Sequence, residues 1–201
     1  MGLKQTPTNQ TILHSRIIPI PPRVTRLVLG IFGMILPIIL VVGNGNKILF
    51  ALSDYYYTNV GIIFVIFFVI FGLMLILYRG FPESNDDLAS TIAGIAAIGI
   101  AIFPTTSDHI AGRNLIGWVH SISTLIFVLS LAYMALFLFP INPNGKWKKV
   151  IYVISGILML IAVVGILGVE FQVFQPFSNP TFWYELIAIE SFGVSWFLKG
   201  I

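Results

Sequence analysis

The sequence has 201 residues, of which 57% are hydrophobic and 9% are charged, and its mean hydropathy is +0.96. Because soluble domains carry about 25% charged residues, this composition excludes an ordinary soluble domain and predicts an integral membrane protein. Cysteine is absent and the net charge is only +3, which excludes disulfides, thiolate nucleophiles and cysteine-ligated zinc and makes nucleic acid a poor partner.

Residues 1–24 precede the first apolar run. Pro19, Pro21 and Pro22 favour an extended or interfacial segment over a helix at the end of this stretch. The apolar run that follows is too long for a cleaved signal peptide, and no small-residue cleavage site precedes a soluble domain. We therefore expect a cytoplasmic lead-in over 1–24, followed by a retained membrane helix.

Six apolar segments of the chain approach the roughly 20 residues that a helix needs to cross a bilayer core of about 30 Å. The connections between them are short and polar, and they leave no room for a separate soluble domain. Helices satisfy their own backbone hydrogen bonds in lipid, so the sequence predicts one all-α polytopic bundle over residues 25–199. Its six transmembrane helices are expected at 25–43, 60–78, 88–104, 117–139, 149–169 and 182–198.

The basic residues predict the orientation of this bundle. With the N-terminus inside, nine lysines and arginines lie on the cytoplasmic side and two on the outer side, which is the bias that the positive-inside rule describes. Both termini are therefore expected in the cytoplasm. The nine are Lys4, Arg16, Arg23, Arg26, Arg79, Lys146, Lys148, Lys149 and Lys199, and the two are Lys47 and Arg113.

This topology gathers the unusual polar residues at the outer face. The stretch ALSDYYYTNV, residues 51–60, precedes the second span, a pair of threonines follows the third, and a histidine opens the fourth. The tyrosines are expected at the membrane interface, and a polar stripe on a membrane helix is expected to face the bundle interior. The predicted outer polar cluster contains Ser53, Asp54, Tyr55, Thr105, Thr106, His109, His120, Ser123 and Glu185.

Glu190 stands apart from this cluster, because helical rise places it about 12 Å into the last span. A carboxylate at that depth costs several kcal/mol unless it is protonated, paired or hydrated. Glu190 is therefore a candidate functional residue, and a protonated Glu190 bonded to a neighbouring helix is the structural alternative. Glu185 points about 140° away from it, so the two glutamates cannot act as one carboxylate pair.

Several short motifs carry a resemblance to known proteins. LFALSDYYYTNVG, YRGF, IAGIAAIGIAIFPT, GWVHSIST and a terminal FGVSWFLKG occur in this order, and together they resemble a widespread group of small six-span bacterial membrane proteins of the domain-of-unknown-function kind. The resemblance covers most of residues 50–201. It implies the bacterial cytoplasmic (inner) membrane and no particular activity.

A more distant similarity is to the alkaline ceramidase-like superfamily of membrane hydrolases, which combine a serine, an aspartate and histidines into a zinc site. This similarity implies such roles for Ser53, Asp54 and His120. The chain differs from that superfamily in having six expected spans rather than seven, and in lacking its paired histidines at helical spacing in a late span.

The sequence favours a non-enzymatic lipid-binding or accessory bundle with membrane lipids as its partners. In this hypothesis the outer polar cluster is a hydrogen-bonded network that closes the bundle. Asp54 would cap the second helix, and His120 would bond Asp54 or Thr105.

Two alternatives use the same residues differently. In a metal-dependent lipid hydrolase, Asp54, His109 and His120 would hold zinc, whose bound water attacks an amide or ester bond. Ser53 would orient that water or stabilise the oxyanion, and Glu185 would support a metal ligand. In the third hypothesis the protein is a small-solute or proton-linked transporter that uses the intramembrane acid Glu190.

Overall fold

The computed structural model describes residues 21–80, 85–106, 114–141, 143, 145–174 and 176–201. These residues form helices and connecting turns and contain no strand, which confirms the predicted all-α class. Residues 1–20 of the predicted lead-in lie outside the described part. The six α-helices are α2 (Pro22–Gly43), α3 (Gly61–Leu77), α4 (Asp86–Ile102), α5 (Leu115–Tyr133), α6 (Lys146–Glu170) and α7 (Pro180–Gly200), and the short helical turns are η1 (Leu52–Tyr57), η2 (Met134–Leu138) and η3 (Phe139–Ile141).

The residues at the starts of several helices explain why the helices begin there. Proline occupies the first position of α2 and of α7, where its fixed φ suits a helix and its missing N–H costs nothing. Asn114 caps α5, since its Oδ1 accepts the backbone N–H of Gly117 at 2.8 Å. Beyond α5 the chain continues through the π-helical turn η2 and the 3-10 turn η3 before α6 begins.

The helices pack in a ring in chain order. Each α-helix packs against the next one, and α7 closes the ring against α2. Glycines allow the closest approaches: a Cβ added to Gly94 of α4 would lie 2.6 Å from the backbone oxygen of Gly72 in α3. A Cβ added to Gly30 of α2 would lie 2.4 Å from the backbone nitrogen of Phe197 in α7. Both helix pairs therefore depend on the absence of a side chain at these positions.

Phenylalanine rings fill the centre of the ring of helices. Successive ring contacts have centroid distances between 4.7 and 6.3 Å, which is the range in which aromatic pairs attract one another. The chain of contacts runs from α3 to α5 and α7. The residues are Phe64, Phe68, Phe71, Phe127 and Phe192.

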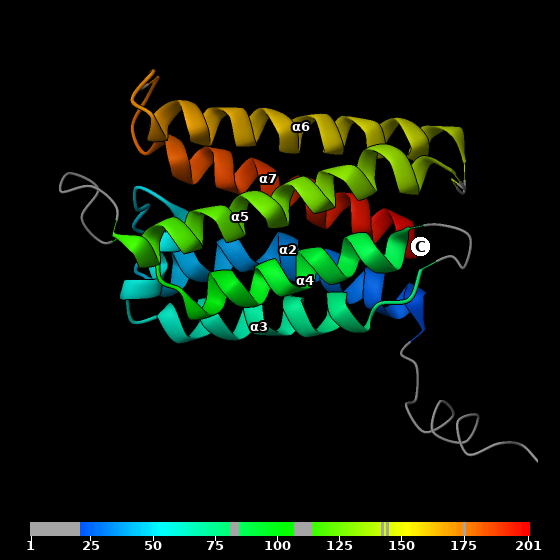
Figure 1. Cartoon of the computed structure of the whole chain (residues 1–201), viewed down its shortest axis with the longest axis horizontal. Helices are drawn as coiled ribbons and strands as arrows, with labels where there is room; N and C mark the ends of the chain where they lie inside the picture. The colour runs from blue at the N-terminus through cyan, green and yellow to red at the C-terminus, as the bar shows by residue number, and fades with distance from the viewer. Residues whose placement is uncertain (1–20, 81–84, 107–113, 142, 144, 175) are drawn as a thin grey trace, which may run out of the picture.

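The bundle has two distinct ends (Figure 1). The turn η1 and the starts of α5 and α7 lie at one end, which we call the η1 end. The start of α2 and the end of α7 lie together at the other, which we call the terminal end. An even number of helical passes between the two ends produces this arrangement.

The exterior is apolar along the helices. Three helices are long and apolar enough to cross a membrane, namely Pro22–Gly43, Leu115–Ile141 and Lys146–Glu170, and Gly61–Leu77 is a shorter apolar helix. Isoleucines on five helices point outward and are exposed, which is typical of a surface that contacts lipid. They are Ile38, Ile62, Ile95, Ile122 and Ile161. The described helices are thus those of a membrane protein.

Candidate functional site

Two carboxylates organise the start of η1. Asp54 Oδ2 accepts the backbone N–H of Ala51 at 3.1 Å. From α7, Glu185 Oε2 accepts the N–H groups of Leu52 at 2.5 Å and of Ser53 at 3.3 Å, and the Ser53 hydroxyl donates to Glu185 Oε1 at 3.4 Å. The first N–H groups of a helix have no partner within it, and negative groups stabilise that end. Glu185 therefore ties η1 to α7.

The predicted role of Asp54 as the cap of the second span is wrong. Its carboxylate folds back onto the start of η1, whereas α3 begins at Gly61 after Val60 and has no side-chain cap. The physical reason is the turn η1 itself, which separates Asp54 from α3 and has its own unsatisfied N–H groups.

Two tyrosines of η1 fasten the neighbouring connections. The Tyr55 hydroxyl donates to the backbone oxygen of Lys47 at 2.6 Å, and the Tyr57 hydroxyl donates to that of Thr105 at 2.5 Å. Burial raises the pKa of Tyr55 and that of Tyr57, so both hydroxyls stay protonated and able to donate at neutral pH. The tyrosines thus have specific partners in addition to the interfacial location that the sequence suggests.

His120 is buried near the start of α5. Its Nδ1 lies 2.7 Å from the backbone oxygen of Phe103, at the end of α4. Since a carbonyl oxygen only accepts, Nδ1 carries the proton in the neutral ring and Nε2 is the acceptor nitrogen. The sequence led us to expect a bond from His120 to Asp54 or Thr105; the observed Nδ1 partner is instead main chain just before Thr105.

Two adjoining cavities lie beside these residues. The larger has a volume of about 220 Å³ and lies at the η1 end between α5, α6 and α7, where α5 and α6 separate from one another (Figure 1). The smaller, of about 50 Å³, extends toward the aromatic centre of the bundle. Either volume exceeds the roughly 10–15 Å³ that one water needs. The residues that border both cavities, which we call the shared lining, are Ser53, His120, Thr124, Val128, Ile166 and Glu185.

The cavities combine a polar end with an apolar depth. Thr105, Ser121, Glu170 and Thr181 add polar groups to the larger cavity. The smaller cavity is bordered mostly by aromatic and aliphatic side chains, including those of Phe64, Phe68, Ile100, Phe127, Met159 and Phe192. Among the described residues, no lysine or arginine borders either cavity. A mostly apolar cavity with a few convergent polar groups is typical of a small-molecule binding site.

The structure brings together only part of the predicted outer polar cluster. Ser53, Thr105, His120 and Glu185 border the larger cavity. Asp54, Tyr55, Thr106 and Ser123 do not border either cavity in the described part of the chain. Ser123 instead faces α4, because a Cβ added to Gly99 would lie 2.5 Å from its hydroxyl oxygen. Thr124, which helical spacing places on the same face of α5 as His120, borders both cavities.

Glu190 lies on the other side of α7 from the cavities. It is partly exposed, about 140° around the helix from Glu185, on the face where Trp183 and Val194 are exposed. No hydrogen bond or ion pair joins Glu190 to another residue that the structure describes. It contributes nothing to the cavities, so no described feature supports its use in transport.

The predicted zinc site stays a prediction. His109 lies outside the described residues, so its distance to the other two ligands is not part of the structure described. Within the described ranges, no group of three or more His, Cys, Asp or Glu side chains has an arrangement that could hold a metal ion. Of the two described ligands, Asp54 accepts the N–H of Ala51 through Oδ2, and His120 contacts a carbonyl oxygen through Nδ1.

A second group of charged residues, which sequence analysis did not single out, is buried at the terminal end. We call Arg26, Asp86, Lys148 and Lys199 the basic cluster; each is more than nine-tenths buried. Both Nε and Nη2 of Arg26 donate to the Tyr78 hydroxyl, the former at 2.8 Å. These residues come from α2, α4, α6 and α7.

The two lysines of the basic cluster bind the ends of helices. Lys199 Nζ donates to the backbone oxygen of Phe139 at 2.9 Å and lies 5.6 Å from the ring centroids of Phe139 and Tyr152. Lys148 Nζ donates to the backbone oxygen of Leu198 at 3.2 Å. Cations are favoured at the C-terminal ends of helices and over aromatic rings, so these contacts explain the cluster as a structural feature. Its one sequence signal is that Lys199 follows Phe192, Ser195 and Trp196 on the apolar face of α7.

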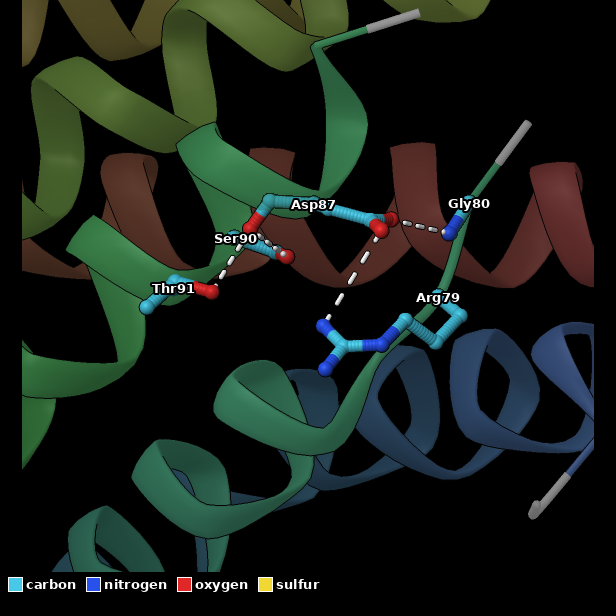
Figure 2. Close-up of polar contacts among 5 residues, drawn as sticks. All are labelled: Arg79, Gly80, Asp87, Ser90 and Thr91. Carbon is cyan, nitrogen blue, oxygen red and sulfur yellow. Dashed lines mark hydrogen bonds and ion pairs between the residues drawn. The ribbon is translucent and has the colours of Figure 1, made fainter. Parts of the chain in front are cut away.

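The exposed charges at this end are structural too. Figure 2 shows Asp87 in the first turn of α4, where Oδ1 accepts the N–H of Gly80 at 2.8 Å and Oδ2 lies 3.9 Å from Arg79 Nη1. The Ser90 and Thr91 hydroxyls donate to the backbone oxygen of Asp87 at 3.1 and 2.6 Å (Figure 2). The contacts of Asp87 with Gly80 and Arg79 hold the chain after α3 against the start of α4, whereas the Ser90 and Thr91 bonds lie within α4.

No protein-family model matches this sequence, and no curated protein or solved structure is significantly similar to it.

Proposed function

We propose that this protein binds a lipid-like amphipathic molecule in the two cavities at the η1 end. The observation that carries the proposal is the shared lining, in which Ser53, Thr124, His120 and Glu185 stand where a wide cavity with polar groups meets a narrow aromatic one. A molecule with one polar end and one hydrocarbon chain matches that gradient, because each part finds the surroundings it prefers.

The same proposal includes the membrane topology. We infer six spans, α2 to α7, in a bacterial cytoplasmic membrane, with the start of α2 and the end of α7 on the cytoplasmic side. Three features support this topology: the exterior of the helices is apolar, the start of α2 and the end of α7 lie at the same end of the bundle, and basic residues gather at that end. The cavities would then lie near the outer leaflet, and the separation of α5 from α6 would give a lipid lateral access to them.

Trp118 borders the larger cavity and offers a direct test. Stearyl alcohol brominated in mid-chain is titrated into the protein in detergent micelles, and tryptophan fluorescence is recorded. Bound probe should quench saturably, and a Trp118→Phe variant should lose that saturable component. Quenching that only rises linearly with the mole fraction of probe in the micelles would contradict the proposed function.

A filled cavity should prevent this binding. The Thr124 hydroxyl bonds back to the carbonyl of His120 in its own helix, so Thr124→Leu adds bulk to both cavities without breaking a contact between helices. We expect at least about tenfold weaker binding of the probe, equivalent to about 1.4 kcal/mol. Thr91→Leu is the matched control, since the Thr91 hydroxyl bonds the carbonyl of Asp87 in the same way and borders neither cavity. Equal binding by both variants would contradict the site.

A further inference from the structure

The ionisable side chains that border the two cavities in the described part of the chain are carboxylates and one imidazole. Glu170 and Glu185 supply carboxylates, His120 supplies an imidazole, and in the described part of the chain neither lysine nor arginine borders either cavity. The buried lysines and arginines among the described residues belong to the basic cluster at the terminal end. A phosphate or carboxylate in the cavity would therefore lie beside Glu185, and no described lysine or arginine at the cavity would neutralise it; like charges in such a position disfavour binding.

Glu185 has an acceptor site that η1 does not fill. Its Oε2 receives the N–H groups of Leu52 and Ser53, whereas Oε1 receives, from the residues that the structure describes, only the Ser53 hydroxyl at the long distance of 3.4 Å. A carboxylate offers about four lone-pair positions, so Oε1 can accept a further and stronger bond. The hydrogen bonds from η1 also hold the carboxylate in position, which lowers the entropic cost of using it for a ligand.

We propose, building on the proposed function, that the polar end of the bound amphiphile is an amine, which donates to Glu185 Oε1 while the hydrocarbon chain lies among Phe64, Phe127 and Phe192. A protonated amine is a compact donor with no acceptor, and its bond to a carboxylate is charge-assisted. Thr124 and His120 border the same space and complete the polar surroundings. A neutral hydroxyl in that place forms a weaker bond, and an anion meets repulsion.

Three amphiphiles with the same lauryl chain test this selectivity. Laurylamine, lauryl alcohol and laurate are each used to displace the brominated probe, with the fluorescence of Trp118 as readout. We expect laurylamine to displace the probe at a concentration about tenfold below that of lauryl alcohol, and laurate to be the weakest. Equal potency of the three, or a preference for laurate, would overturn the amine proposal.

Two conservative variants assign the selectivity to one carboxylate. Glu185→Gln keeps an amide oxygen for the N–H groups of η1 but removes the charge, and should reduce the preference for amine over alcohol to near unity. Glu190→Gln is the control, because Glu190 lies on the same helix but borders neither cavity. In this variant the preference for amine over alcohol should persist. A preference that survives Glu185→Gln would overturn the role of Glu185.

The results distinguish the amine proposal from the function on which it rests. If the brominated probe itself binds without saturation, the proposed function fails and the amine proposal fails with it. If the probe binds saturably and the three lauryl compounds displace it equally, the amphiphile site stands and only the amine proposal is overturned. Thermal unfolding of both glutamine variants verifies that the compared proteins are folded.

Discussion

The two ends of the bundle place polar side chains in opposite surroundings. At the η1 end, Ser53, His120 and Glu185 border open volume. At the terminal end, Arg26 and Lys199 are enclosed by a tyrosine hydroxyl, a backbone oxygen and aromatic rings. Buried polar groups are therefore not by themselves a sign of function; the difference lies in whether space for a ligand adjoins them.

Both ends nevertheless use the same electrostatics of helix termini. Glu185 meets the N–H groups at the start of η1, and Lys148 meets a carbonyl at the end of α7. Each charge lies at the helix end of opposite partial charge. What separates the two ends is packing: aromatic rings fill the terminal end around its cations, whereas the divergence of α5 and α6 leaves volume at the η1 end.

The largest effect is expected from breaking the enclosed end. Arg26→Leu removes both hydrogen bonds to Tyr78 and leaves that buried hydroxyl without its cationic partner, so the free energy of unfolding should fall by about 3 kcal/mol. Unfolding in detergent by increasing sodium dodecyl sulfate, followed by tryptophan fluorescence, measures this change; buried Trp196 reports on it because its ring lies 5.2 Å from that of Tyr78.

Arg79→Leu is the matched control for this prediction. Arg79 lies at the same end, but its ion pair with Asp87 is 3.9 Å long and the two side chains are 65% and 50% exposed. Exposed pairs contribute about 0–1 kcal/mol, so the free energy of unfolding should change little. Similar losses in the two variants would refute the distinction between enclosed and exposed charges at the terminal end.

A smaller effect is expected from releasing η1. Glu185→Ala removes the acceptor for the N–H groups of Leu52 and Ser53, and should cost about 2 kcal/mol. Amide hydrogen exchange at these two positions should accelerate, because local opening of η1 becomes easier. Glu190→Ala removes a carboxylate of α7 that has no such contact, and exchange in η1 should stay unchanged. Unaltered exchange in Glu185→Ala would contradict the connection between α7 and η1.

The helices could be predicted from the sequence because apolar runs of membrane length carry a strong signal. The expected segment at 60–78 corresponds to α3 (Gly61–Leu77), and that at 149–169 to α6 (Lys146–Glu170). The start of α2 is less predictable: the prolines before it, Pro22 included, favour an extended segment, yet Pro22 is the first residue of α2. Proline breaks a helix in its interior but is favoured at its first position. Which of these two effects applies to Pro22 depends on where the helix starts.

The candidate site could be predicted only as far as topology determines it. Ser53, Thr105, His120 and Glu185 reach the same end because alternate connections of a helical bundle lie together. Whether Ser123 or Thr124 borders the cavity depends on the rotation of α5, and the partner of His120 Nδ1 is main chain at Phe103, which carries no side-chain signal. The burial of Lys148 and Lys199 depends on contacts among α6, α7 and η3. A count of basic residues predicts the orientation in the membrane but contains no information on these contacts.

The smallest effects concern the tyrosines that fasten the η1 end, and they measure how firmly that end is closed around its cavities. Tyr55 is 0% exposed and Tyr57 is 51% exposed, although each hydroxyl donates one bond to a backbone oxygen. Tyr55→Phe leaves the carbonyl of Lys47 without this donor in a buried setting, so a loss of about 1 kcal/mol in the free energy of unfolding is expected. Tyr57→Phe should cost less than about 0.5 kcal/mol, since water can replace the lost bond at an exposed position. Unfolding of the two variants under identical detergent conditions measures the difference, and a larger loss for Tyr57→Phe would mean that the connection at Thr105, rather than the one at Lys47, holds the η1 end together.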